Sequence, residues 1–93
     1  MSVGVLKLKF RVHGASSLKD KRSIVQPFIH RIRKNYNLSV SELEGEDDRS
    51  SVTLGFAHIA KSSDLNHRKL AQLVKEAEKV KNLQIERESK EVL

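Results

Sequence analysis

The hydrophobic pattern of this chain switches between two periods, and it does so twice in the same order. Strict alternation of apolar and polar residues is typical of a half-buried strand, and apolar residues spaced three and four apart are typical of an amphipathic helix. These patterns predict strand, helix, strand, strand, helix and strand at residues 5–13, 17–37, 38–44, 52–59, about 62–81 and 83–88. The chain therefore predicts a β-α-β-β-α-β order.

That order is the ferredoxin-like arrangement, an α+β fold with a four-stranded antiparallel sheet and two helices on one face. The nearly continuous apolar run at 52–59 suits a central strand. A length of 93 residues supports a single domain spanning residues 1–93. No run approaches the ~20 apolar residues of a membrane span, and there is no cysteine. We therefore expect a cytoplasmic protein without a membrane partner, and we expect residues 89–93 to fray.

The first helix has a clear start and an ambiguous middle. Ser17 is a suitable N-cap, and Asp20 completes a pair that resembles a capping box. Pro27 removes the backbone hydrogen bond to the carbonyl of Ser23, so it predicts either a kink or a helix that starts near Ser23. Asn37 is expected to end the helix in a left-handed conformation.

Positive charge is concentrated in the first half of the chain. The net charge is +6, yet residues 1–41 hold nine Lys/Arg and one acid, whereas residues 42–93 hold nine Lys/Arg and eleven acids. A basic half favours an anionic partner such as RNA. The candidate nucleic-acid contacts all lie in the first helix: Lys19, Lys21, Arg22, His30, Arg31, Arg33 and Lys34. Because Phe10 and Phe56 are in phase with the buried face of the sheet, we expect phosphate contacts rather than base stacking.

The first strand carries a second row of cations. Lys7, Lys9 and Arg11 lie on its polar side. In the expected strand order they face the outward side chains of the last strand, Gln84, Glu86 and Glu88. Such cross-strand pairs would neutralise the row, which would leave the helix as the main uncompensated basic surface.

Catalytic and metal sites are weakly indicated. The turn that leads into the first helix could bind an anion through Gly14, Ser16 and Ser17. Small acylphosphatases share this size and fold and hold an anion in that turn. They also need an arginine there and an asparagine on the third strand, and this chain has neither. The four histidines, at positions 13, 30, 58 and 67, have no metal-ligand spacing. We expect no catalytic residue, no metal and no cofactor.

The segment SLKDKRSIVQPFIHRIRKNYNLSVSELE resembles the YlxP-like family, small bacterial proteins of unassigned function. The SLKDKR start, Arg31, Arg33 and the Tyr36-Asn37 step carry the resemblance, which extends less specifically through LGFAHIAKSSD. The family implies a ferredoxin-like fold. Its genes often lie near those of translation initiation and ribosome-binding factors, which implies an RNA or ribosome partner. The loop at 46–50 lacks the aromatic residue that relatives tend to have.

Three functions follow from these patterns. The first is a non-enzymatic RNA- or ribosome-associated protein that binds through its basic first helix. The alternative is a protein-interaction module or homodimer, built through the open sheet face or an edge strand. A small acylphosphatase-like enzyme is the third.

Overall fold

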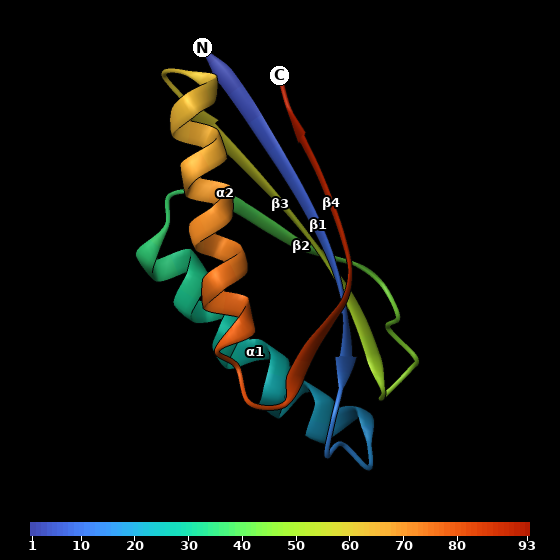
Figure 1. Cartoon of the computed structure of the whole chain (residues 1–93). Coiled ribbons are helices and arrows are strands. Elements are labelled where there is room, and N and C mark those ends of the chain that lie inside the picture. The colour runs from blue at the N-terminus through green and yellow to red at the C-terminus, as the bar shows by residue number, and fades with distance from the viewer.

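A computed structural model describes residues 1–93 and has six regular elements in the order β-α-β-β-α-β (Figure 1). They are β1 (Ser2–Val12), α1 (Leu18–Asn35), β2 (Ser39–Glu44), β3 (Ser51–Ala60), α2 (Ser63–Glu78) and β4 (Leu83–Val92). The strands form one antiparallel sheet in the order β2-β3-β1-β4, and both helices lie on the same face of it (Figure 1). The predicted ferredoxin-like fold is confirmed. No helix is both long and apolar enough to cross a membrane.

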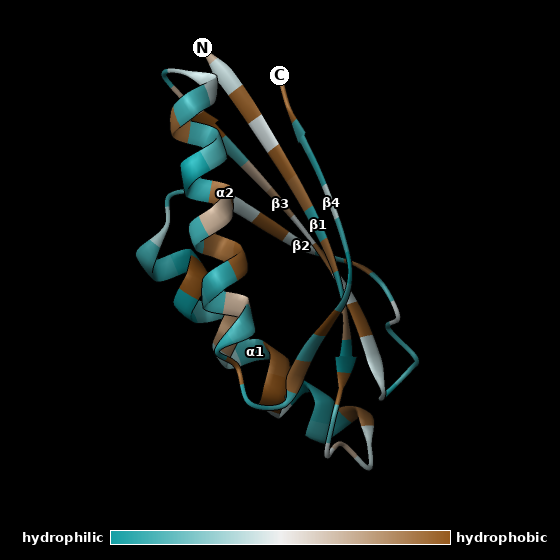
Figure 2. Cartoon of the chain, viewed as in Figure 1, coloured by the Kyte–Doolittle hydropathy of each residue, from teal (hydrophilic) through white to brown (hydrophobic).

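The core lies between the sheet and the two helices. Every second residue of β1 is buried from Leu6 to Val12, and the apolar bands alternate along this strand in Figure 2. Phe10 meets Phe28 of α1 edge to face, with ring centroids 6.1 Å apart. Phe10 is 0% exposed and Phe56 2% exposed. The sheet therefore has no exposed aromatic ring on β1 or β3 for stacking a base, as the sequence predicts.

The first helix is continuous through its proline. Pro27 lies inside α1, which begins after Ser17 as expected, so the alternative start near Ser23 is wrong. The end of the helix also differs from the prediction. Tyr36 is the C-cap, in an extended conformation, and its N–H donates to the carbonyl of Ile32. No residue other than glycine has a positive φ, so Asn37 is not left-handed.

A buried chain of polar groups joins the N-terminus to α2. Asn66 is fully buried. Its Nδ2 donates to the hydroxyl of Ser2 over 3.0 Å, and its Oδ1 lies 2.7 Å from Nδ1 of His58. The Ser2 hydroxyl in turn donates to the carbonyl of Leu93 over 2.7 Å. Burial of these polar groups costs little free energy because each has a partner.

The C-terminal strand extends further than the sequence suggests. It continues to Val92, and Leu93 exchanges two backbone hydrogen bonds with Val3, of 3.1 and 2.8 Å. The two termini consequently lie side by side at one end of the sheet (Figure 1). The expectation that residues 89–93 fray is wrong, because β1 begins early enough to pair with them.

Candidate nucleic-acid interface

The turn before α1 is filled by one of the chain's own carboxylates. Gly14 has the positive φ that the turn requires, 81°. The hydroxyl of Ser17 accepts a hydrogen bond from the N–H of Asp20 over 3.0 Å. The Asp20 carboxylate accepts from the N–H and the hydroxyl of Ser16, over 3.1 and 2.6 Å. Gly14, Ser16 and Ser17 therefore do not form the open anion site that was predicted, because the donors of Ser16 are taken and Asp20 repels a second anion.

The hydrogen bonds from Ser16, first from its hydroxyl and then from its N–H, lower the pKa of Asp20 below its ordinary value of 3.8. A carboxyl group whose pKa is lower in the folded protein than in the unfolded chain stabilises the fold fully above its unfolded-state pKa. That stabilisation is lost as the pH falls through the folded-state pKa. We predict that Asp20→Asn lowers the melting temperature at pH 7, and that the gap to the wild type narrows below pH 3.8. Melting curves of both proteins at pH 7 and below pH 3.8 check this. A difference in melting temperature that does not change with pH would contradict it.

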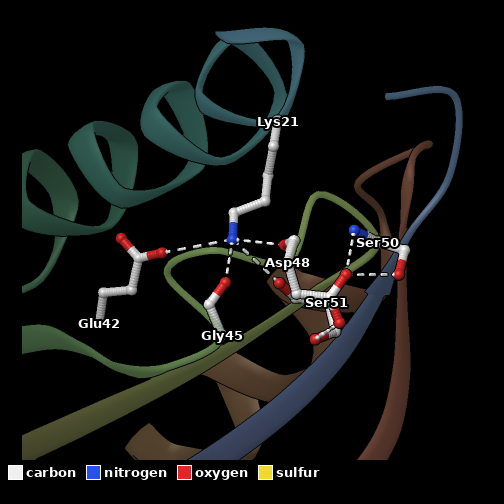
Figure 3. Close-up of polar contacts among 6 residues, drawn as sticks. All are labelled: Lys21, Glu42, Gly45, Asp48, Ser50 and Ser51. Carbon is white, nitrogen blue, oxygen red and sulfur yellow. Dashed lines mark hydrogen bonds and ion pairs between the residues drawn. The ribbon is translucent and has the colours of Figure 1, made fainter. Parts of the chain in front are cut away.

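Lys21 is a structural residue and not an RNA contact. Its side chain is only 4% exposed. The ammonium donates to the carbonyls of Gly45, Asp48 and Ser51 over 2.5, 2.8 and 3.0 Å, and it lies 3.8 Å from the carboxylate of Glu42 (Figure 3). A buried charge needs such a set of partners. The ammonium has no room for a phosphate, so the prediction of Lys21 as a nucleic-acid contact is wrong.

Asp48 shapes the loop that Lys21 holds. Its carboxylate accepts from the N–H and hydroxyl of Ser50 and from the hydroxyl of Ser51, over 2.9, 2.7 and 3.1 Å. These hydrogen bonds, led by the Ser50 hydroxyl, lower the pKa of Asp48. The acidic β2–β3 loop, residues 45–50, is thus a folded turn that packs against the start of α1.

Arg31 and Arg33 each make a contact that holds α1 against the rest of the fold. The Arg31 guanidinium lies 4.0 Å from the carboxylate of Glu76 in α2, and 5.7 Å from the centroid of the Phe28 ring. Arg33 donates to the carbonyl of Val40 over 3.2 Å, which ties α1 to β2. Both side chains join α1 to neighbouring elements, but both residues are exposed and have further N–H donors.

The four remaining predicted contacts are exposed and have no ion-pair partner. They are Lys19, Arg22, His30 and Lys34. Helical geometry places Lys19, His30 and Lys34 on the side of α1 opposite its buried stripe, and Arg22 on the exposed flank between the two. We call these four residues the outer basic face. At 1.5 Å per residue, the face extends for about 22 Å along the helix.

The strand cations are arranged differently from the prediction. Arg11 does contact Glu86, with 3.4 Å between Nε and Oε1. Lys9, however, faces Arg87, and Lys7 faces Ser89, because a β-bulge shifts the register of β4 between Lys9 and Phe10. The predicted neutralisation of Lys7 and Lys9 by Glu86 and Glu88 is therefore wrong.

Arg87, which faces Lys9, carries no signal in the sequence pattern. No periodic signal identifies it, because the bulge depends on how the strands pair. No group of three or more His, Cys, Asp or Glu side chains is placed to hold a metal ion.

Comparison with known proteins places the chain in a family. A family model described as a protein of unknown function, DUF503, matches residues 3–89. This chain belongs to the DUF503 family. The uncharacterised protein YlxP of Bacillus subtilis (strain 168) is 24% identical over 72 residues, which cover 77% of this DUF503 protein and 78% of YlxP. The YlxP-like resemblance is confirmed.

Two solved structures share the fold of this DUF503 protein. One is a mutant of SnoaB, a cofactor-independent oxygenase from Streptomyces nogalater, with a TM-score of 0.56 and 17% identity over 99% of this chain and 90% of that one. The other is a de novo designed protein with a ferredoxin fold, with a TM-score of 0.52 and 18% identity over 99% and 84%. At such identities the likeness concerns the fold alone.

The structure gives a physical role to the family-like SLKDKR segment of this DUF503 protein. Ser17 caps α1, Asp20 closes the turn before it, and Lys21 holds the β2–β3 loop. These three residues build the start of the helix. Lys19 lies between Ser17 and Asp20 in the sequence, Arg22 follows Lys21, and both belong to the outer basic face.

Proposed function

We propose that this DUF503 protein is a cytoplasmic, non-enzymatic RNA-binding or ribosome-associated protein that contacts phosphates through the outer basic face of α1. The observation that carries the proposal is the lack of any acidic partner for these four exposed residues of α1. The only acid in α1, Asp20, is already engaged by Ser16. Cations without intramolecular partners are free to replace the counterions of a phosphate backbone.

The geometry favours recognition of shape and charge over sequence. The face is a row of ammonium, guanidinium and imidazole groups on a rigid helix, and such groups contact phosphate oxygens. Both Phe10 and Phe56 are buried. Binding should therefore vary little among structured RNAs of similar size but different sequence.

Salt dependence tests the proposal. About three charged phosphate contacts, from Lys19, Arg22 and Lys34, predict that the logarithm of the association constant falls with the logarithm of salt concentration with a slope of about −2 to −3. Fluorescence anisotropy with a labelled RNA hairpin across a salt series measures this slope. An affinity that does not change with salt would rule out a contact made mainly through phosphates.

A second candidate is self-association or protein binding through the open face of the sheet, the face that the helices leave uncovered. Val5, Leu43 and Ile59 are 41%, 48% and 66% exposed. A shallow, mostly apolar hollow of about 280 Å³ lies beside Val5 and Leu43, over Gly55 and Ala57. Sedimentation over a range of concentrations tests this function: a mass that rises with concentration and falls back in Ile59→Lys supports it, and a constant monomer mass opposes it.

A further inference from the structure

The bulge in β4 brings like charges together where the unbroken register would have paired opposite ones. Ile85 faces Phe10, and two residues later Arg87 faces Lys9, so Glu86 is the extra residue. Without this residue shift, the register set by Ile85 would place Glu86 opposite Lys9 and Glu88 opposite Lys7. Directly opposed like charges destabilise a sheet. Bulges are common beside functional sites, where they redirect a side chain.

The redirected side chain joins a row that crosses all four strands. Arg87 of β4 faces Lys9 of β1, Lys9 faces Thr53 of β3, and Thr53 faces Glu44 of β2. A second bulge, in β2 between Glu42 and Glu44, sets the last of these pairs. Both edge strands are thus irregular at the same level of the open face.

This row borders a polar hollow of about 190 Å³. No hydrophobic residue lines it, and its wall consists of Lys7, Lys9, Glu44, Thr53, Arg87 and Ser89. Glu44 is 3.4 Å from Lys7, whereas Lys9 and Arg87 take part in no ion pair. Three cations and one carboxylate leave the hollow with a net charge of +2.

We propose that this hollow binds a phosphate group. Arg87 offers a planar fork of N–H donors, Lys9 and Lys7 offer ammonium groups, and the hydroxyls of Thr53 and Ser89 can complete the set. A dianionic phosphate would neutralise the net charge and relieve the repulsion between Lys9 and Arg87. Thr53 is only 4% exposed, so the floor of the hollow is held in place before any ligand arrives.

The phosphate could belong to a small phosphorylated molecule or to a nucleic-acid backbone, which present the same group to the site. The hollow is on the open face of the sheet, whereas α1 lies on the covered face (Figure 1). The two surfaces are therefore separate, and the site does not depend on the RNA contact proposed for α1.

Titration of the ¹⁵N-labelled protein tests the site with three probes: inorganic phosphate, adenosine 5′-monophosphate and a single-stranded RNA oligonucleotide. We expect saturable shifts of the amides of Lys9, Thr53 and Arg87 with at least one probe. A response to phosphate or the mononucleotide identifies a small ligand, and a response to RNA alone identifies a backbone phosphate. No saturable shift with any probe would overturn the proposal.

Arg87→Glu separates binding from folding. The new carboxylate faces Lys9, so we expect the variant to melt about 2–5 °C higher than the wild type and to bind the active probe about 10-fold or more weakly. Lys81→Glu makes the same change in net charge in an exposed loop and should bind as the wild type does. Equal affinity of Arg87→Glu and the wild type would overturn the proposal. Arg22→Glu with Lys34→Glu should leave phosphate binding intact, which distinguishes this site from α1.

Discussion

Replacing Lys21 with alanine is expected to lower the free energy of unfolding by about 3 kcal/mol, because three partly buried backbone carbonyls lose their partner together. The carbonyls of Gly45, Asp48 and Ser51 each accept a hydrogen bond from this ammonium. Without it they must be hydrated at the edge of the core or remain unsatisfied. Urea denaturation of the wild type and the variant measures the difference.

Lys19→Ala is the matched control for this experiment. Lys19 lies two residues earlier in the same helix, is exposed and has no ion pair, so its replacement should change stability by no more than about 0.5 kcal/mol. Under conditions where the Lys21→Ala variant is still folded, the Lys21→Ala variant should bind RNA as the wild type does. A small effect of Lys21→Ala on stability, or a selective loss of RNA affinity, would contradict the structural role.

Reversing two charges of the outer basic face, with Arg22→Glu and Lys34→Glu, is expected to weaken binding of a structured RNA about 100-fold at moderate salt. Each substitution removes a phosphate contact and adds a repulsion. Arg22 and Lys34 are suitable because neither contacts another element through an ion pair. Arg31 is less suitable, because its contacts with Glu76 and Phe28 join α1 to α2.

The control for the reversal is Lys61→Glu with Lys81→Glu. Both residues are exposed and lie in the connections beside α2, and the change in net charge is the same. If the outer basic face binds RNA, the control should retain affinity within about threefold, as expected for charges outside the contact. Equal losses in the two double variants would show that net charge alone governs binding, and that α1 has no special part.

The fold was predictable because it rests on local periodicity. The alternation in β1 and the helical spacing in α1 reflect burial on one side of each element, and burial on one side is what the sequence pattern records. The structural role of Lys21 was also indicated by its position in the sequence pattern. Lys21 falls on the same helical stripe as Val25, Phe28 and Ile32, all of them buried, so its position already indicated a side chain directed inward.

The register of β4 could not be read in the same way. Whether Glu86 or Arg87 faces Lys9 depends on a single extra residue in the pairing of two strands far apart in sequence. Alternation of polar residues from Gln84 to Glu91 is compatible with both registers, since neither face of this stretch is strongly apolar. The charge of the open face was therefore wrongly predicted, although the strand itself was found.

Mapping the amide chemical shifts of the ¹⁵N-labelled protein while a structured RNA hairpin is added tests the central claim most directly. If α1 is the RNA-binding element, the largest changes should fall at and around Lys19, Arg22, His30 and Lys34, and should diminish as salt is raised. Changes confined to the open face of the sheet, with the amides of α1 unmoved, would contradict the claim.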